Sequence, residues 1–402
     1  MSVSLKARRE KLRDSAYSIG GLVLMQAAAQ LLLYPLLARI MGEVRYGELQ
    51  YLMAFVNIAT VSVGTAANLS RITAPREERE GAGGAYNRFL LTVALLGIPL
   101  CLLIWRFGGV AMDPLTAFTY YLVFVAMAFR YYADVIYKIT LSYRRYFLYY
   151  LIIGTGYVLG ALLFCGTGLW PLAILTGEAA GVAFAYLTEG GLRGSEKNAV
   201  PLEKSTLRAL LILCLSEGVA NLILNADRLL LKLLVGSAAV TVYYLSTLVG
   251  KTMSLLSTPL SGVLLGHLAR YEGGLRRRAL RWILPGSLAA ILLGTGAATL
   301  GGYVMLRWLY PAELDAVLPY LLYGSLAEVL YFTTTVLTAL LARFGKKRHQ
   351  IYVNGLFALC FVGLGIPATL LYDVRGFAVA AVIAGTLRWL AALLLLFFTA
   401  KE

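Results

Sequence analysis

The sequence predicts an all-α polytopic membrane protein with about twelve transmembrane helices in two pseudo-symmetric six-helix lobes around a central cavity. Hydrophobic residues make up 59% of the 402 residues, charged residues only 14%, and the mean hydropathy is +0.74. Soluble domains do not have this composition. About twelve stretches reach the roughly 20 apolar residues that a membrane-spanning helix needs, and a polar break near the middle of the chain divides them into two equal sets.

The apolar stretches predict the helices in order. We expect helices over residues 16–41, 46–70, 88–107, 115–138, 146–166, 169–190, 206–235, 238–266, 283–307, 315–343, 351–371 and 376–400. The predicted domains are an N-terminal lobe over 1–193, a cytoplasmic linker over 194–205 and a C-terminal lobe over 206–402. Gly42 and Gly236, which follow the first and seventh helices, stand 194 residues apart. This offset indicates a repeat whose halves flank a central site.

The distribution of basic residues predicts the orientation. Of the 36 Lys and Arg residues, 26 fall at the two ends of the chain and in alternate connections, whereas the opposite loops hold only Arg45, Arg106, Arg307 and Arg375. Because cytoplasmic loops retain positive charge during insertion, both termini are expected in the cytoplasm. The net charge of +15 therefore reflects topology, and nucleic-acid binding is an unnecessary interpretation.

Neither a signal peptide nor a metal or redox centre is expected. The first apolar run is too long for the apolar core of a cleavable signal, so it is predicted to remain as an anchor. The four cysteines lie in apolar helices without metal-binding or redox spacing, and we interpret them as small buried hydrophobic residues. They are Cys101, Cys165, Cys214 and Cys360.

Polar residues in the first lobe have competing interpretations. Arg39 ends the first helix, where its side chain can reach the outer interface. One face of the second helix carries Asn57, Thr60, Gly64, Asn68 and Arg71. This face either packs tightly on a neighbouring helix or lines an aqueous cavity.

Charges in later helices of this lobe point to pairing. Arg130, Asp134 and Lys138 are spaced four residues apart, which predicts that they neutralise one another along one helix. Glu178 lies between two glycines in an apolar helix, and is expected to be protonated, paired, or involved in binding a coupling ion.

The second lobe begins with two helices that carry polar stripes. One stripe is Glu217, Asn221, Asn225, Arg228 and Lys232, and the other is Tyr244, Thr247, Lys251, Ser254 and Thr258. Charges inside a membrane helix are costly, so the stripes predict either a water-filled groove between the lobes or an internally paired network. Asp227 is expected to tune its basic neighbours without binding substrate. Glu328 and Arg388, in later helices, each have a structural interpretation.

Two segments carry a family resemblance. PLLARIMGEVRYGELQYLMAFVNIATVSVGTAANLSR (35–71) and NADRLLLKLLVGSAAVTVYYLSTLVGKTMSLLSTPLSGVLLGHLAR (225–270) resemble the polysaccharide flippases, which carry O-antigen, capsule or teichoic-acid units. These proteins belong to the multidrug/oligosaccharidyl-lipid/polysaccharide exporter superfamily. The order and spacing of the segments and the expected number of helices agree over essentially the whole chain.

The resemblance implies a function and a set of site residues. A flippase of this kind moves a polyprenyl-(pyro)phosphate-linked oligosaccharide from the inner to the outer leaflet of the bacterial cytoplasmic membrane by alternating access, for surface polysaccharide synthesis. The implied cavity residues are Arg39, Arg71, Arg228, Lys232 and Lys251, with Asn68, Asn221 and Asn225. Asp227, Glu217, Glu178 and Glu328 are the residues expected to couple transport to H⁺ or Na⁺ or to tune the local charge.

The implied partners are the lipid-linked oligosaccharide and membrane lipids, with no cofactor and no nucleic acid. The protein is expected to act as a monomer, alone or beside polysaccharide assembly proteins. One observation opposes a strongly cationic cavity. Six basic residues are expected to be buried in the membrane and face five buried acidic ones, which leaves a net charge of only +1. The basic residues are Arg39, Arg130, Arg228, Lys232, Lys251 and Arg388, and the acidic ones are Asp134, Glu178, Glu217, Asp227 and Glu328.

Two alternatives remain open. An ion-coupled multidrug or cation exporter of the same superfamily commonly depends on an acidic residue in its first helix, and residues 16–41 contain none. A membrane-embedded polysaccharide polymerase or transferase would need a reactive group or a sizeable outer loop, whereas the outer loops are short and both histidines fall in cytoplasmic connections. The sequence shows no zinc spacing, nucleophile elbow or phosphate loop, so catalysis is not expected.

Overall fold

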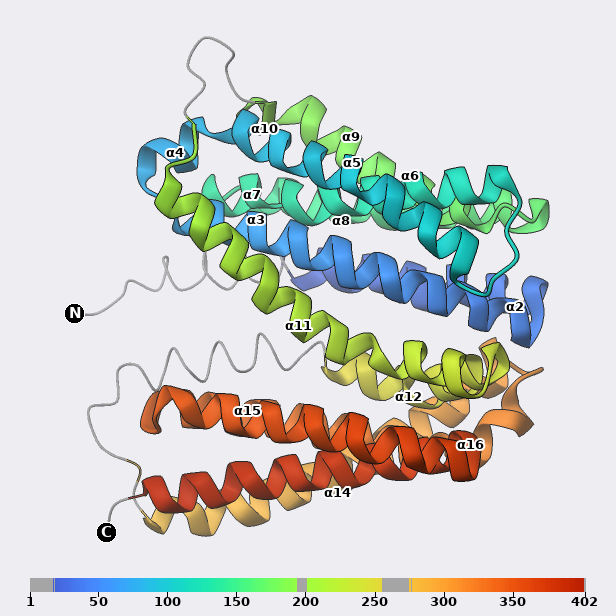
Figure 1. Cartoon of the computed structure of the whole chain (residues 1–402), viewed down its shortest axis with the longest axis vertical. Coiled ribbons are helices and arrows are strands. Elements are labelled where there is room, and N and C mark those ends of the chain that lie inside the picture. The colour runs from blue at the N-terminus through green and yellow to red at the C-terminus, as the bar shows by residue number, and fades with distance from the viewer. Residues whose placement is uncertain (1–16, 18, 194–200, 255–274, 276, 401–402) are drawn as a thin grey trace. The chain divides into compact units, whose positions relative to one another are not determined.

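The computed structural model describes residue 17 and residues 19–193, 201–254, 275 and 277–400 (Figure 1). These residues form helices and connecting turns without a strand, which confirms the all-α class. Within them, eight helices are long and apolar enough to cross a membrane. Two of the eight, Ile19–Thr73 and Arg348–Thr399, contain a backbone break, at Gly42 and at Tyr372–Asp373. The chain is therefore a polytopic membrane protein.

The helices overlap every predicted span. The first half contains η1 (Ala29–Leu33), α2 (Tyr34–Val56), η2 (Asn57–Val61), α3 (Ser62–Thr73), α4 (Arg76–Gly81), α5 (Gly83–Phe107), α6 (Pro114–Ala133), α7 (Val135–Ile139), α8 (Tyr143–Phe164), η3 (Cys165–Thr167), α9 (Trp170–Thr188) and α10 (Gly190–Arg193). The second half contains α11 (Lys204–Leu234), α12 (Ser237–Ser254), α14 (Arg277–Leu309), α15 (Leu314–Phe344) and α16 (Lys347–Thr399). Linker residues 194–200 and the part of the predicted helix 238–266 beyond Ser254, including Thr258, lie outside the described residues.

The chain divides into two compact units whose bounds differ from the predicted lobes. One unit is Met1–Gly42 with Leu52–Ala226, and the other is Glu43–Tyr51 with Asp227–Glu402. The boundary thus falls inside α11 rather than in the expected linker. Local contacts explain the difference at α11, because the Asn221 amide nitrogen donates a hydrogen bond to Ser62 Oγ, 3.2 Å away, within the first unit. The arrangement of two transport lobes remains a prediction.

The short segment Glu43–Tyr51 belongs with the second unit because it packs against the start of α12. Thr241 Oγ1 donates a hydrogen bond to the Glu43 carbonyl oxygen at 2.7 Å. A Cβ atom at Gly47 would lie only 1.8 Å from the Ser237 carbonyl oxygen, so only glycine permits this approach. Residues 43–51 therefore pack as part of the second unit.

The two glycines of the predicted repeat have similar backbone roles. Gly42 has φ 73° and Gly236 has φ 136°, and each stands where one helix ends and the next begins. Positive φ of this kind is strained for residues with a Cβ atom. Both glycines thus permit a helix junction, and the repeat with an offset of 194 residues stays a prediction.

Small residues bring α8 and α9 close together in the first unit. A Cβ atom at Gly156 would lie 2.6 Å from Gly177 Cα, and one at Gly160 would lie 2.2 Å from the Ala173 carbonyl oxygen. Helices in lipid associate through such close packing, since lipid removes the hydrophobic driving force that acts in water. This packing fixes α9, and with it Glu178, against α8.

Asp113 caps the N-terminus of α6 outside the membrane-spanning segments. Its carboxylate accepts hydrogen bonds from the Thr116 backbone nitrogen at 3.0 Å and from Thr116 Oγ1 at 2.6 Å. These bonds lower the pKa of Asp113 below its ordinary value. The stabilisation is therefore complete above the ordinary pKa and is lost as the pH falls through the lowered one.

We expect Asp113→Ala to lower the unfolding temperature at neutral pH, because Ala cannot accept the two bonds from Thr116. The difference from the wild type should narrow at acid pH, as the carboxylate of the wild type becomes protonated. Thermal unfolding of both proteins in detergent, at neutral pH and at about pH 3, measures this effect. A difference that does not change with pH would contradict the cap.

Candidate functional site

In the first unit, Arg71 holds three elements together. Its side chain is fully buried on α3. The guanidinium donates hydrogen bonds to the Arg79 carbonyl oxygen at 3.0 Å, to Tyr132 Oη at 2.6 Å and to the Gly191 carbonyl oxygen at 2.9 Å. All three acceptors are protein atoms, so the structure favours packing over the solvated cavity position expected for this residue.

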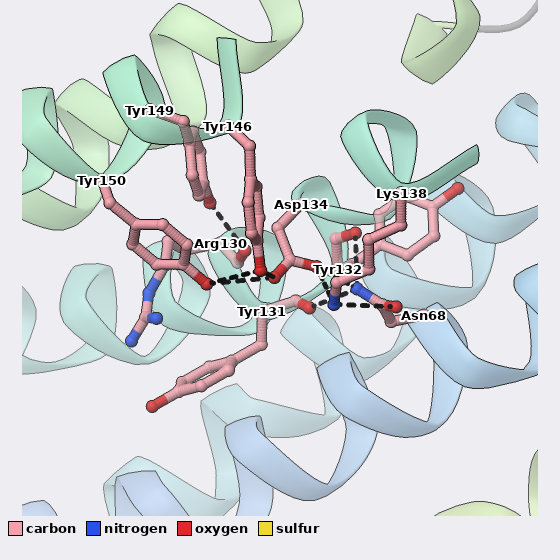
Figure 2. A network of polar contacts seen from close by, with 9 residues as sticks. All are labelled: Asn68, Arg130, Tyr131, Tyr132, Asp134, Lys138, Tyr146, Tyr149 and Tyr150. Atoms are coloured by element: carbon pink, nitrogen blue, oxygen red, sulfur yellow. Dashed lines mark hydrogen bonds and ion pairs between the residues drawn. The ribbon is translucent and has the colours of Figure 1, made fainter. Parts of the chain in front are cut away.

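Asn68 and Asp134 form the centre of a polar network where helix four is broken (Figure 2). Asp134 stands between α6 and α7, and its Oδ1 accepts hydrogen bonds from the Asn68 amide and from Lys138 Nζ, the latter at 2.9 Å. The Asn68 amide also donates to the Tyr131 carbonyl oxygen at 3.2 Å. Asn68 therefore joins α3 to the break in helix four, and the predicted Asp134–Lys138 pair is confirmed.

Two tyrosines complete this network from α8. The hydroxyls of Tyr146 and Tyr150 each donate a hydrogen bond to Asp134 Oδ2 at 3.1 Å, and Figure 2 shows both converging on that oxygen. Both oxygens of the carboxylate are thus satisfied. The four donors to Asp134 come from α3, α7 and α8, so this carboxylate joins three helices at the break in helix four.

The prediction that Arg130 is neutralised along its own helix is wrong. Arg130 Nε lies 2.8 Å from Glu178 Oε2 on α9, and the two side chains are only 7% and 1% exposed. The Tyr157 hydroxyl also donates a hydrogen bond to Glu178 Oε1, and the Arg130 Cζ atom lies 3.7 Å from the centre of the Tyr131 ring. The close packing of α8 on α9 positions the Glu178 carboxylate. Glu178 is therefore paired, which is one of the three states expected for it from the sequence.

Several stripe residues of the first unit bond to nearby backbone. The Asn221 amide donates to the Glu217 carbonyl oxygen at 2.9 Å, and the Asn225 amide donates to the Asn221 carbonyl oxygen at 2.8 Å. The Glu217 side chain is half-buried, and Arg39 is exposed. Arg39 is thus a predicted cavity residue of this unit whose side chain is accessible.

In the second unit, Asp227 pairs with Lys251 rather than with its neighbours on α11. Lys251 Nζ lies 2.5 Å from Asp227 Oδ2, and this salt bridge joins α11 to α12. The expectation that Asp227 mainly tunes Arg228 and Lys232 is therefore incomplete, because its direct partner is on the next helix. The pair neutralises one of the predicted substrate-binding cations.

Arg228 has an aromatic partner. Its Cζ atom lies 4.7 Å from the centre of the Tyr244 ring, and its side chain is partly exposed. In the described part of the chain no carboxylate forms an ion pair with Arg228, and its Nε has no hydrogen-bond partner. A guanidinium held against a ring keeps its charge and its in-plane donors available.

Lys232 and Glu328 lie near Arg228 and make contacts of their own. Lys232 Nζ donates a hydrogen bond to Ser237 Oγ at 2.7 Å, which ties α11 to the start of α12. A Cβ atom at Gly250 would lie 2.6 Å from Glu328 Cβ, so α15 approaches α12 beside Lys251. The second unit therefore gathers Arg228, Lys251, Asp227 and Glu328 around α12, which agrees with the predicted polar stripes.

The aromatic partners were not foreseen from the sequence. Tyr157 on Glu178, Tyr146 and Tyr150 on Asp134, and Tyr244 under Arg228 all support charged groups. A signal was present in the tyrosine-rich start of α8, YRRYFLYY, where tyrosines recur at three- and four-residue spacing. Apolar helices with tyrosines on one face can supply hydroxyl donors to buried carboxylates.

The Asp227–Lys251 pair can be tested by a double-mutant cycle. Asp227→Asn should lower the free energy of unfolding by about 1 to 3 kcal/mol, because it removes a charge-assisted hydrogen bond between a partly buried ammonium and a carboxylate. Combining Asp227→Lys with Lys251→Asp should recover part of that loss, because the pair is restored in the opposite sense. Thermal unfolding in detergent reports the cycle, and zero coupling between the two positions would contradict the salt bridge.

Comparison with known proteins identifies the fold. No protein-family profile and no curated protein matches the sequence. Among solved structures, a MATE in the straight conformation aligns with a TM-score of 0.64 and 15% identity, over 96% of this chain and 94% of the other. The lipid II flippase MurJ in its inward closed conformation aligns with a TM-score of 0.60 and 12% identity, over 95% and 87%.

A third structure, the Vibrio cholerae MATE transporter VcmN in the bent form, aligns with a TM-score of 0.59 and 16% identity, over 97% of this chain and 98% of the other. These identities are too low to indicate shared activity or substrate. The likeness extends over nearly the whole chain in all three cases, so the protein has the fold of the MATE transporters and MurJ.

Proposed function

We propose that this protein is a flippase that moves a polyprenyl-(pyro)phosphate-linked oligosaccharide from the inner to the outer leaflet of the bacterial cytoplasmic membrane, without chemical change, for surface polysaccharide synthesis. The observation that carries the proposal is Arg228, a partly exposed guanidinium that stacks on Tyr244 and has no carboxylate partner among the described residues. Such a group fits a phosphate, which arginine binds through its planar set of donors.

The charge pattern of the second unit favours an anionic substrate over a cationic one. Asp227 is occupied by Lys251, so the carboxylate best placed to attract a cation is already neutralised. Lys232 bonds to a neutral hydroxyl and, among the described residues, forms no ion pair. The positive charge that remains is suited to holding a pyrophosphate.

A polar route is physically necessary for this transport. A pyrophosphate and several sugars must cross about 30 Å of hydrocarbon that offers them no hydrogen bonds. Arg228 and Lys232 in the second unit supply cationic donors, while the prenyl chain can remain in lipid. Alternating access of two lobes, as the fold of MATE transporters and MurJ permits, would expose the route to each leaflet in turn.

The remaining parts of the proposal concern topology and energy. Both termini lie in the cytoplasm, in agreement with the distribution of basic residues. Glu217 and Glu328 are the carboxyl groups left for H⁺ or Na⁺ coupling, since Glu178 and Asp227 are held in ion pairs. The protein functions as a monomer, alone or beside polysaccharide assembly proteins.

Deletion of the gene tests the function directly. The deletion strain should lose surface polysaccharide and accumulate the lipid-linked oligosaccharide on the cytoplasmic face, where added glycan-modifying enzyme reaches it only after the membrane is opened. Complementation with the wild-type gene should restore both. Unchanged surface polymer together with reduced efflux of organic cations would refute the proposal and favour the multidrug exporter.

A further inference from the structure

Arg388 is a buried cation in the second unit that none of the contacts described above explains. It lies on the part of α16 that follows the Tyr372–Asp373 break, and only 3% of its surface is exposed. Eleven residues separate it from Thr399, so it stands about 16 Å from that end of the helix at 1.5 Å per residue. This depth is close to half the thickness of a bilayer core. A cation at this depth needs a partner.

The partners of Arg388 in the described part of the chain are all neutral. Nη2 donates a hydrogen bond to Asn354 Oδ1 at 2.9 Å, and Nη1 donates to the Tyr331 carbonyl oxygen at 3.3 Å. The Cζ atom lies 4.2 Å from the centre of the Tyr331 ring and 5.2 Å from that of Phe357. Nε has no hydrogen-bond partner. The guanidinium thus lies over the Tyr331 ring and over the Phe357 ring, and no carboxylate of the described residues neutralises its charge.

Asn354 separates this cation from the surface of the unit. Its side chain is exposed, although it lies in an otherwise apolar stretch of α16. One turn earlier on the same helix, the Gln350 amide donates a hydrogen bond to the Thr338 carbonyl oxygen of α15 at 3.2 Å. Polar groups therefore follow one another along α15 and α16 from the Lys347 end of α16 to Arg388.

We propose that Arg388 is a phosphate-binding station at mid-membrane depth, and that the Asn354 amide oxygen occupies the position which a phosphate oxygen takes when the ligand binds. The ligand class is a phosphate ester of a lipid, and identifying it as the transported polyprenyl-linked substrate rests on the proposed function. No atom of the described residues accepts a hydrogen bond from Nε, so a phosphate can accept two parallel bonds from Nε and Nη2.

The aromatic partners give the station a chemical character distinct from that of an internal salt bridge. Tyr331 and Phe357 hold the guanidinium plane without neutralising it. A carboxylate at the Asn354 position would neutralise it permanently. The chain instead places an uncharged, exposed amide there, which a diffusing anion can displace.

Asn354→Asp is the decisive variant, because it is nearly isosteric and supplies the missing carboxylate. We expect it to raise the unfolding temperature, since it pairs a buried cation, and to weaken phosphate binding about 10- to 100-fold, the loss of one charge-assisted hydrogen bond. Arg388→Gln should weaken binding similarly. Arg348→Gln is the matched control, because it changes the net charge by the same amount as Asn354→Asp at an exposed position on the same helix, and it should bind as the wild type does.

Binding is measured as the ligand-induced rise in unfolding temperature of the full-length protein in detergent. The probes are a polyprenyl phosphate, the matching polyprenol without phosphate, phosphatidic acid and inorganic phosphate. A shift with the polyprenyl phosphate alone identifies the lipid carrier, whereas an equal shift with phosphatidic acid identifies a general lipid phosphate, and a shift with inorganic phosphate alone identifies the free ion. Whichever of these shifts the wild type shows, binding of that probe must be about 10- to 100-fold weaker in Asn354→Asp for the station to stand.

Three results would overturn the station. The first is a rise in unfolding temperature with the polyprenol that equals the rise with the polyprenyl phosphate. The second is a phosphate-dependent rise that is as large in Asn354→Asp as in the wild type. The third is an unfolding temperature of Asn354→Asp, without ligand, below that of the wild type. The results differ if the flippase function is wrong but Arg388 still binds a phosphate. In that case the deletion strain keeps its surface polymer, while phosphatidic acid or inorganic phosphate still shifts the wild type and fails to shift Asn354→Asp.

Discussion

Arg130→Met and Glu178→Gln should each lower the free energy of unfolding by about 3 to 5 kcal/mol, because each variant leaves an uncompensated charge in the interior of the first unit. The two side chains are 7% and 1% exposed, and their ion pair spans α6 and α9 at 2.8 Å. A penalty of this size is a large fraction of the stability of a typical domain. We therefore expect low membrane abundance of both single variants and a lower unfolding temperature of the protein that is recovered.

The double variant Arg130→Met with Glu178→Gln separates stability from function. It removes both charges and keeps an acceptor for the Tyr157 hydroxyl, so most of the lost stability should return. Arg76→Gln is the surface control, because Arg76 and Glu80 form an ion pair with side chains 80% and 57% exposed, and breaking it should cost less than about 1 kcal/mol. A double variant no more stable than the single ones would show that the pair does more than neutralise charge.

The double variant also tests whether Glu178 couples ion flow to transport. A coupling carboxyl must exchange its proton or ion during the cycle, whereas Glu178 is held by Arg130 and by Tyr157. If the double variant is stable and restores surface polymer, Glu178 is a structural residue. If it is stable and inactive, the ion pair must open during transport.

The class and helices of this fold could be predicted because they depend on local composition. Twenty apolar residues in succession have few alternatives to a membrane helix, since every backbone polar group must be satisfied within lipid. The glycines at four-residue spacing in α8 and α9 are likewise a local signal, and the two helices approach closely at those glycines. The two compact units could not be delimited in this way. Their boundary depends on contacts such as Thr241 with Glu43, which join residues far apart in sequence.

Charge pairs along one helix were predictable, and pairs between helices were not. The four-residue spacing of Asp134 and Lys138 places them on one face, and the structure joins them at 2.9 Å. Arg130 has the same spacing from Asp134, yet it turns to Glu178, which is 48 residues away. Spacing limits which residues can meet on a helix, but the packing of α8 on α9 decides which carboxylate is available.

Arg71 shows that the sequence could not distinguish a residue that lines a cavity from one that packs against neighbouring helices. The polar face of the second helix was compatible with either a cavity or tight packing, because both require small and polar residues. The structure uses Arg71 to join α3 to α4, α6 and α10, and the sequence around Arg71 does not indicate these acceptors. Arg228 was predictable as a site residue only because it belongs to the polar stripe of the helix predicted over residues 206–235. Its free donor and its stacking on Tyr244 emerge from the three-dimensional arrangement.

Arg228→Glu should reduce surface polysaccharide about 10- to 100-fold in a complemented deletion strain while leaving membrane abundance near normal. The side chain is partly exposed and forms no ion pair with a described residue, so reversing its charge breaks no salt bridge there and repels a phosphate. Arg228→Lys should retain part of the activity, because an ammonium keeps the charge but loses the planar set of donors and the stacked geometry on Tyr244.

Lys251→Glu provides the contrast that identifies a loss of transport as distinct from a loss of folding. It places a second carboxylate beside Asp227, where Lys251 Nζ now lies 2.5 Å from Asp227 Oδ2, so its main effect should be low abundance. Surface polymer is measured by immunoblot, and membrane abundance is measured on the same cells. If Arg228→Glu is present at the wild-type level and restores full surface polymer, phosphate recognition at Arg228 is wrong, and organic-cation efflux becomes the activity to measure in that strain.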